Sequence, residues 1–397
     1  MAEPVYSLGI ISKRPELLKK NLPLYVRKMP EPRRWRIILR DGDTEHEDNG
    51  GFLKRLAMET GVRFSHLSDG GSAELARELG LALGRRADAL FSEGYGGLRN
   101  SVALLAALHG THLVFIDDDT SPLYNFIERY ERLFAEGRGL IPGGYEGHIS
   151  VSSPALLYDL SHVLSLAAGG EMAAEDASSA AARIMRGVPF KRESYSLNMV
   201  AGGNLGISLA LLRQVPFCPT KRRVEDALFF MTVAALRPDA VYRPSDYREA
   251  YDRLPLVEHE RVPSERPCLL SQLLDEMRGA VLAGVIGEMD MASFVKETNI
   301  TEKDLEVALA AAVERTWKDF GVELFRKNIT ENARFLGEQE RAELDGINAL
   351  GKDDITVGLE ELKEQLNLFS FALRTWPYVT AAVEEEEVRK RILKVVG

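Results

Sequence analysis

Residues 115–120, with the sequence FIDDDT, constrain the fold of this chain more than any other stretch. The apolar run 113–116 predicts a buried strand, and the carboxylates Asp117, Asp118 and Asp119 follow it directly. In open α/β sheets, ligands bind beyond the carboxyl ends of the strands. Adjacent acids repel one another, so a fold that keeps them together usually offsets their charge with a cation. Mg²⁺ suits such a place, because it binds one or two carboxylates together with substrate phosphates. An acidic turn is the alternative.

Strand and helix signals alternate through the first half of the chain. This alternation predicts βαβ units and therefore an α/β protein with a mostly parallel sheet flanked by helices. After residue 121 the pattern is less regular, and a loop is expected at 243–267, before a helical C-terminal region. We expect strands at 5–11, 36–39, 62–67, 113–116 and 239–242, and helices at 12–29, 52–60, 72–90, 99–109, 152–186, 224–236, 268–285, 302–319, 330–350, 359–372 and 379–396.

Composition and charge exclude several classes of protein. The net charge of −10 argues against broad electrostatic binding of nucleic acid. Two cysteines, Cys218 and Cys268, are too few for a disulfide framework or a cysteine-based zinc site and indicate a reducing compartment. No apolar run approaches the ~20 residues of a membrane-spanning helix, and the N-terminus does not read as a signal peptide. We therefore expect a cytoplasmic protein, with a peripheral position at the membrane as an option.

Five weak motifs occur in an informative order. SKRPELL follows the first strand, IILRDGDT ends the second, GYGGLRN precedes the aspartate strand, and GGNLG and RRVED come later. This order resembles the inverting, family-2-like GT-A glycosyltransferases, which have a Rossmann-like domain and use nucleotide sugars. The resemblance implies a GT-A catalytic domain at 1–262, with a nucleotide-sugar half at about 1–120 and an acceptor half at about 121–262. Residues 263–397 would form a helical C-terminal domain, through which a homo-oligomer could form.

The resemblance implies a nucleoside-diphosphate sugar donor held with Mn²⁺ or Mg²⁺. Asp119 would bind the metal most directly, together with Asp117, and His259 lies where some members of the family place a metal-ligating histidine. Asp41 would contact the nucleobase, although a turn-forming aspartate is an equal alternative. The other residues implied to bind the nucleotide sugar are Ser12, Arg14, Arg99, Asn100, Asp117, Asp118 and Gly203.

The acceptor side is implied by the two later motifs. Asp226 would be the general base that deprotonates the acceptor hydroxyl, and Glu225 would contact the acceptor; helix capping is the alternative for both acids. The glycine-containing segment at 202–204 would border the sugars. Because Lys221 precedes two arginines, the acceptor could be anionic. The remaining acceptor-binding residues would be Gly202, Asn204, Arg222 and Arg223.

Other functions remain open at the level of sequence. Retaining synthases of small glycosides share much of this scaffold, so the stereochemistry of transfer is only partly assigned by the resemblance. The DDDT pattern at 117–120 is also similar to aspartyl phosphatases of the haloacid-dehalogenase type, which place their nucleophile on the first strand. A non-catalytic nucleotide- or glycan-binding scaffold would not need all of Asp117, Asp119 and Asp226. A nucleotidyltransferase would carry a glycine-rich loop after its first strand, which this chain lacks.

Overall fold

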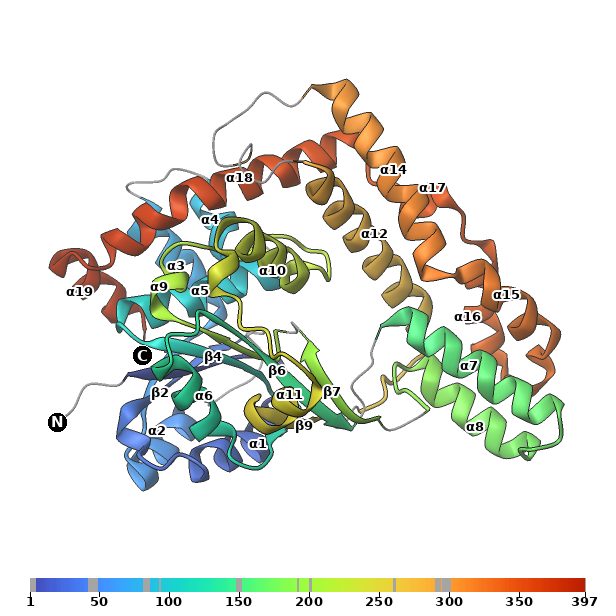
Figure 1. Cartoon of the computed structure of the whole chain (residues 1–397), viewed down its shortest axis with the longest axis horizontal. Coiled ribbons are helices and arrows are strands. Elements are labelled where there is room, and N and C mark those ends of the chain that lie inside the picture. Colours follow the sequence, from blue (N-terminus) through green and yellow to red (C-terminus); the bar gives the residue numbers. More distant parts are fainter. Residues whose placement is uncertain are drawn as a thin grey trace.

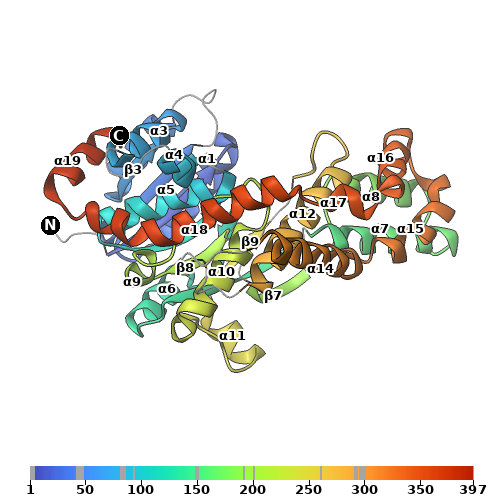
Figure 2. The same ribbon diagram turned by 90° about the horizontal axis from the view of Figure 1, so that it is seen from above.

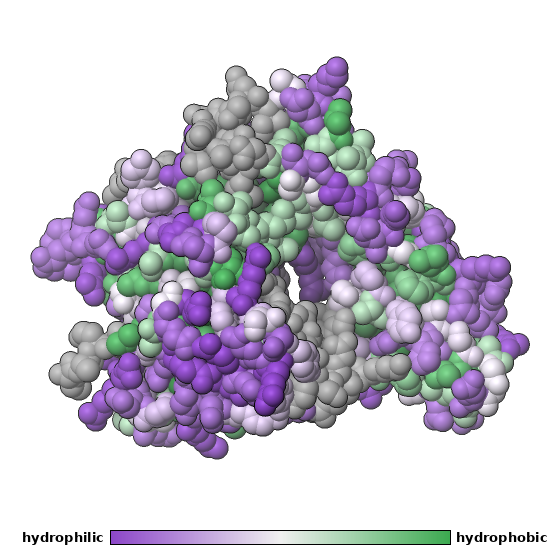
Figure 3. Space-filling model, in the orientation of Figure 1, coloured by the Kyte–Doolittle hydropathy of each residue, from purple (hydrophilic) through white to green (hydrophobic). Residues whose placement is uncertain are grey.

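The computed structural model describes residues 5–41, 49–80, 86–92, 94–147, 152–190, 193–199, 202–259, 262–289, 294 and 301–396. These residues form a part built around a twisted sheet and a second part made of helices, with one long helix, α18, running from one to the other (Figure 1). In the space-filling view, a hollow lies between the two parts (Figure 3).

The sheet has nine strands in the order β3-β2-β1-β4-β8-β6-β9-β5, with β7 paired to β6. Its first four strands are parallel, whereas β8 runs antiparallel to both β4 and β6. The sheet is therefore parallel from β3 to β4 and mixed beyond β4. The strands are β1 Tyr6–Ser12, β2 Trp35–Asp41, β3 Arg63–Leu67, β4 His112–Asp117, β5 Thr120–Pro122, β6 Leu140–Gly147, β7 Glu193–Met199, β8 Asn204–Ile207 and β9 Leu256–His259.

The register of the parallel strands brings three side chains to one edge. Ser12 pairs with Asp41, and the neighbouring Ile11 pairs with Asp117. Because parallel strands all end at the same edge, the polar residues that follow three separate apolar runs converge there. The buried residues Leu8, Ile38 and Val114 fix this register from the interior of the sheet.

The helices around the sheet cover both of its faces (Figures 1 and 2). Helix α5 is almost entirely buried, because its run of valine, leucine and alanine leaves no polar face. Gly96 in its first turn allows a very close approach of the loop before α10, since an added Cβ would lie 1.8 Å from the carbonyl oxygen of Cys218. These helices are α1 Pro15–Arg27, α2 Asn49–Thr60, α3 Asp69–Gly80, α4 Arg86–Ser92, α5 Gly94–Leu108, α6 Phe126–Ala135, α9 Leu209–Leu212, α10 Glu225–Leu236 and α11 Tyr247–Arg253.

The helical part combines segments that are distant in the sequence. Helices α7 and α8 leave the sheet after β6 and share one apolar core with helices α12 to α18. The long helix α18 then returns, so that Trp376 is fully buried against the sheet part and donates from Nε1 to the carbonyl oxygen of Leu212 at 2.6 Å. These helices are α7 Ser153–Ala168, α8 Ala174–Met185, α12 Leu269–Glu288, α14 Glu302–Phe320, α15 Val322–Glu331, α16 Glu338–Ala349, α17 Lys352–Ile355, α18 Leu359–Ala382 and α19 Glu386–Val395.

The structure corrects several local predictions. The segment 243–267, predicted as a loop, contains α11 and β9, and the strand predicted at 239–242 is a short 3-10 helix, Pro238–Ala240, followed by a single bridge at Val241. One helix, α18, runs through Pro377, where the sequence predicted a break. The helix predicted at 330–350 is divided near Gly337, which precedes α16.

The structure confirms the predicted class, an α/β GT-A-like architecture with an α-helical C-terminal region. The proposed division into domains at residues 262 and 263 stays a prediction, as does association through the helical region. Among the described residues, no helix combines the length and the apolar character that crossing a membrane requires.

Candidate active site

The candidate site lies at the carboxyl edge of the parallel strands, opposite the turn at Gly202 and the start of α10. Strand β4 supplies Asp117 and leads directly into Asp118 and Asp119. The turn Gly202-Gly203 comes against this edge, because the N–H of Asp117 donates to the carbonyl oxygen of Gly203 at 3.3 Å. Sequence segments around residues 12, 117, 202 and 225 are thereby brought together.

Asp118 holds the strand ends in place. Its buried carboxylate accepts a 2.8 Å hydrogen bond from Ser12 Oγ and forms an ion pair with Arg14. Its carbonyl oxygen accepts from Asn21 Nδ2 at 2.8 Å. Burial raises the pKa of Asp118, although its bonds to Arg14 and Ser12 oppose the shift. Ser12, Arg14 and Asp118 therefore form one network next to the proposed nucleotide site.

Asp119 faces two cationic or potentially cationic partners. Its Oδ2 lies 2.9 Å from Arg14 Nη2 and 3.5 Å from His259 Nε2. Burial alone would raise the pKa of Asp119, but His259 and Arg14 outweigh it and hold this pKa at about 2. His259 ends strand β9 and pairs with Thr120, so the sheet brings it back from far along the chain to the aspartates. Asp119 is therefore ionised at neutral pH.

Asp117 is close to Asp119 on one side and to the acids of α10 on the other. Burial and the charge of Asp119 raise its pKa to about 6, against the opposite influence of Arg99 and His259. Gly203 packs against its carboxylate, and an added Cβ there would lie 2.0 Å from Asp117 Oδ2. Only glycine fits at position 203 while the carboxylate keeps this position.

Arg99 joins the two acids of α10 to the glycine turn. Its Nη1 donates to the carbonyl oxygen of Gly202 at 2.9 Å, and its Nε lies 3.3 Å from Asp226 Oδ1 and 3.5 Å from Glu225 Oε1. Asp226 Oδ2 accepts a 2.6 Å hydrogen bond from the N–H of Gly202. The guanidinium also lies over the Phe115 ring, 5.1 Å from its centroid. Burial by itself would lower the pKa of Arg99. The surrounding acids outweigh this effect and raise the pKa, so the guanidinium stays charged.

The acids Glu225 and Asp226 differ in their surroundings. The side chain of Glu225 is 9% exposed and that of Asp226 is 26% exposed. Burial and the charge of Asp226 raise the pKa of Glu225 to about 7, in spite of Arg99. Asp226 Oδ1 has no hydrogen-bond partner among the described residues, which leaves a buried acceptor unsatisfied.

Asp41 ends β2 within a second network. Its Oδ2 lies 2.5 Å from His66 Nε2, and its Oδ1 accepts from Asn49 Nδ2 at 2.9 Å. Neither His66 nor Asn49 was predicted to lie beside Asp41, because neither residue stands in a recognisable sequence motif. The contact of Asp41 with a nucleobase stays a prediction. The rest of the DGDT turn predicted after β2 lies outside the described residues.

Two of the predicted ligand residues are bonded to the backbone. Asn100 is fully buried, and its amide bonds the backbone of Phe217 on both sides and the carbonyl oxygen of Leu90. Asn204 is also fully buried; it donates to two carbonyl oxygens and accepts from Tyr130 Oη at 2.7 Å. These bonds hold backbone segments near the site, and the contacts of Asn100 and Asn204 with a ligand stay predictions.

The two arginines before α10 point to different places. Arg222 Nη2 lies 2.5 Å from Glu361 Oε1 of α18, whereas the exposed Arg223 lines a separate polar pocket. Their predicted role in acceptor binding stays a prediction, and the structure separates what the sequence treated as one cluster.

Tyr145 is a site residue that the sequence did not indicate. It is buried on β6, and burial together with the charges of Asp117 and Asp226 raises its pKa well above the usual range. Its ring also lies edge-on to that of His259, with centroids 6.4 Å apart. Strand β6 itself was not predicted, so no sequence signal could place this phenol between the two groups of acids.

The side chains that could act as metal ligands show whether a divalent cation fits this site. Among the described residues, no group of three or more potential ligands is arranged as a preformed cage. Asp117 and Asp119 nevertheless supply two carboxylates whose mutual repulsion a cation would relieve, and His259 stands beside them. This set fits Mg²⁺ or Mn²⁺ taking its remaining ligands from phosphate oxygens and water. The aspartates and His259 would hold such an ion only together with a phosphorylated ligand.

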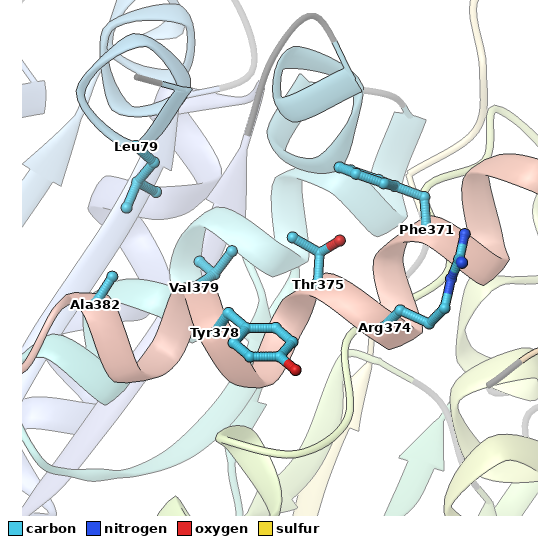
Figure 4. Close-up of a pocket in the computed structure, with 7 residues that line it drawn as sticks. All are labelled: Leu79, Phe371, Arg374, Thr375, Tyr378, Val379 and Ala382. Atoms are coloured by element: carbon cyan, nitrogen blue, oxygen red, sulfur yellow. The ribbon is translucent and has the colours of Figure 1, made fainter. Parts of the chain in front are cut away.

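A cavity of about 510 Å³ lies elsewhere, along α18 and beside α3 (Figure 4). Its lining is mainly apolar and includes Leu79, Phe371, Tyr378 and Val379. None of the residues that line it belongs to the candidate site, so this cavity has no part in the chemistry described above.

Comparisons with known proteins give solved structures only, because no family model and no curated protein matches the chain. One is the glucosyl-3-phosphoglycerate synthase from Mycobacterium tuberculosis in complex with Mn²⁺, UDP and glucosyl-3-phosphoglycerate. Its sequence identity is 15%, over 66% of this chain and 73% of that chain, with a TM-score of 0.32.

Two further structures cover more of the chain. The mannosyltransferase PcManGT from Pyrobaculum calidifontis, with GDP-Man and Mn²⁺, is 12% identical over 99% of this chain and 88% of that chain, with a TM-score of 0.39. S. aureus TarS 1-349, in complex with UDP-GlcNAc, is 13% identical over 91% and 92%, with a TM-score of 0.40. These values are low, so we base the function on the site itself.

Proposed function

We propose that this protein is a metal-dependent glycosyltransferase that moves a sugar from a nucleoside-diphosphate sugar to an acceptor hydroxyl, with inversion at the anomeric carbon. The arrangement of two groups of acids around Arg99 supports this proposal. Asp117 and Asp119 stand at the end of β4, Glu225 and Asp226 stand at the start of α10, and Arg99 lies between these groups.

The aspartate side of the site is suited to a diphosphate. Asp117, Asp119 and His259 would hold Mn²⁺ or Mg²⁺, which would neutralise charge on the diphosphate as it leaves. Arg14 lies 2.9 Å from Asp119, so it is placed to turn toward the same phosphates when they bind. Ser12 and Asp41 share the register of these strand ends and would border the nucleoside. The donor thus binds across the edge of the parallel strands.

The acid pair on α10 is suited to the acceptor. Asp226 is the more exposed of the two, and its Oδ1 lacks a hydrogen-bond partner among the described residues. An acceptor hydroxyl would approach the exposed part of this carboxylate and give up its proton to it as the hydroxyl oxygen attacks. Arg99 fixes the orientation of Asp226, because its Nε lies 3.3 Å from Asp226 Oδ1.

Direct displacement follows from the opposite placement of these groups. The acceptor oxygen would form its bond to the anomeric carbon while the bond to the diphosphate breaks, so no covalent intermediate with the protein is needed. The positive charge of Arg99 and the bound metal would stabilise the negative charge of the departing diphosphate. A cytoplasmic location, predicted from two cysteines that are free in the structure, belongs to the same proposal.

The test is a thermal-shift screen of nucleoside diphosphates with and without Mn²⁺, because a ligand that binds only the native state raises the melting temperature. One diphosphate should raise it in the presence of Mn²⁺ and fail to do so with a chelator. The matching nucleotide sugar should then be consumed, and the anomeric configuration of the product, read by NMR, should be opposite to that of the donor. No stabilisation by any member of the panel would rule out the function, and retained configuration would rule out inversion.

A further inference from the structure

A second cavity, of about 300 Å³, lies where α8, α12 and the segment before α10 meet. We call it the Arg186–Arg223 pocket. Its wall is polar and combines side chains from three separate stretches of sequence. It is lined by Arg186, Gly187, Arg223, Val262, Ser264, Cys268, Ser271, Gln272 and Asp275.

Backbone hydrogen bonds hold one wall of this pocket in place. The N–H of Cys268 donates to the carbonyl oxygen of Met185 at 2.8 Å, and that of Ser264 donates to the carbonyl oxygen of Arg186 at 3.0 Å. Gly187 then turns the chain away with a φ of +86°, which favours glycine. Arg186 is therefore carried on a fixed turn between α8 and α12.

The two arginines of the pocket are poorly compensated. Arg223 has no ion-pair or hydrogen-bond partner for its side chain among the described residues. Arg186 Nη2 lies 3.7 Å from Glu340 Oε1, and its buried Nε has no hydrogen-bond partner in the described part of the chain. One acid, Asp275, also lines the pocket. Glu340 approaches Arg186 only to 3.7 Å and Asp275 is the second acid nearby, so Arg223 is the cation that lacks a partner among the described residues.

The first turn of α12 adds to this charge. The helix runs from Leu269 to Glu288, and its positive N-terminal end opens at Cys268. Glu343 already accepts a bond from the N–H of Leu270 at 2.6 Å, so the helix end is partly used. The hydroxyl of Ser271 is also used, because it donates to the carbonyl oxygen of Cys268 at 2.9 Å. The two arginines therefore provide most of what an oxyanion would need.

The pocket adjoins the acids of the candidate active site through one short segment. Arg223 is separated from Glu225 only by Val224, which is buried. Helix α12 packs directly on this segment, since a Cβ added at Gly279 would lie 3.1 Å from Val224 Cβ and 3.3 Å from the carbonyl oxygen of Arg223. Arg223 and the acid pair therefore stand on one short segment, with α12 packed against it.

We propose that the Arg186–Arg223 pocket binds the oxyanion group, a phosphate ester or a carboxylate, of the acceptor whose hydroxyl group receives the sugar. The assignment of this group to the acceptor rests on the proposed function, whereas binding of the anion does not. With a neutral acceptor, Arg223 would keep no ionic partner among the described residues, two positions before the acid pair.

Cys268 provides a readout that needs no activity. It lines the pocket and is partly exposed, whereas Cys218 is buried, so a thiol reagent should modify Cys268 first. In the full-length protein, inorganic phosphate at about ten times its dissociation constant should slow alkylation of Cys268 by iodoacetamide roughly tenfold, relative to chloride at equal ionic strength. Acetate in a parallel series distinguishes a carboxylate site from a phosphate site.

Arg186→Gln and Arg223→Gln should each abolish this protection. Arg237→Gln is the matched control, because Arg237 pairs with Asp239 and does not line the pocket. Protection by phosphate or acetate in the parent and the control, lost in both pocket variants, supports the site. Alkylation that neither anion slows in the parent, or protection that persists in both pocket variants, overturns it.

Kinetic measurements test this inference separately from the proposed function on which it rests. With a donor found by the thermal-shift screen, glycerol and glycerol phosphate serve as neutral and anionic acceptors. Arg223→Gln should raise KM for the anionic acceptor about 10- to 100-fold and leave kcat nearly unchanged. Transfer to neutral acceptors alone, unaffected by the variant, refutes the pocket's role in acceptor binding while the proposed function stands. Anion protection without any transfer refutes the function and leaves the anion site.

Discussion

The backbone of Gly202 contacts both Asp226 and Arg99: its N–H donates to Asp226 Oδ2 at 2.6 Å, and its carbonyl oxygen accepts from Arg99 Nη1 at 2.9 Å. A single residue thereby sets the position of the acid and of the cation that faces it. An added Cβ would lie 1.8 Å from Arg99 Nη2, so no side chain fits without moving the guanidinium.

Gly202→Ala should therefore displace Arg99 and lower turnover, with a smaller effect on the binding of nucleoside diphosphate. Steady-state kinetics and a binding titration would check this. Gly70→Ala is the control, since a Cβ at this helical position meets nothing within 4 Å; its stability should change by about 1 kcal/mol or less. Normal turnover in Gly202→Ala would show that the close contact with Arg99 is not needed.

Asp226→Asn should lower turnover ~10²–10⁴-fold, because a positioned general base is lost while the shape of the side chain is kept. The affinity for the donor should hardly change, since Asp226 stands on the acceptor side. Glu225→Gln should instead weaken the use of the acceptor. Equal and small effects of both changes would assign the pair to helix capping.

Glu225 should also make stability depend on pH. Its pKa is about 7 in the folded protein and near 4.5 when unfolded, so between these values the folded protein holds a proton that the unfolded chain has released. The free energy of unfolding should then decrease as pH rises from 4.5 through 7. In Glu225→Gln this contribution is absent, so melting temperatures measured across that range should decrease less. Parallel curves for the two proteins would contradict the raised pKa.

Asp119→Asn should abolish stabilisation by nucleoside diphosphate with Mn²⁺, since the change removes a charged ligand without changing the shape of the side chain. The fold should persist, which circular dichroism would verify. Asp239→Asn is the control, because Asp239 is an exposed acid that pairs with Arg237, away from the strand ends. A variant at position 119 that still responds to Mn²⁺ would remove Asp119 from the metal site.

Trp376→Ala should destabilise the protein by about 3–5 kcal/mol, the usual cost of emptying a buried aromatic site. The ring is fully buried, and its Nε1 donates to Leu212. Tyr378→Ala, two residues along the same helix, should change stability little, because that ring is 75% exposed. Chemical denaturation would measure both; a small effect of the tryptophan change would mean that α18 contributes little to the sheet part.

The predictions from sequence succeeded where a regular pattern met a regular element. The apolar runs that became β1, β2 and β4 end in polar residues, and parallel pairing alone is enough to bring Ser12, Asp41 and Asp117 to one edge. The start of α10 at Glu225 was likewise predicted, because the acids precede a continuous apolar stretch.

What the sequence missed depends on contacts between distant segments. Strands β5 to β9 were not predicted, and with β6 the phenol of Tyr145 was missed. The backbone groups that the amides of Asn100 and Asn204 bond are likewise brought near only by the complete fold. Pro377 ordinarily disfavours a helix, yet here the buried Trp376 and Val379 on either side hold α18 together.

The return of α18 to the sheet has a consequence for how the chain folds while it is being synthesised. Leu90, Phe91 and the buried face of α5 share one apolar core with Trp376, Val379 and Ile392. Domains often fold in order as they leave the ribosome. Here the first four strands can pair early, but one face of their core stays exposed to water until the last helices emerge. During that interval the nascent chain carries an uncovered apolar surface, which is where a chaperone would be expected to bind.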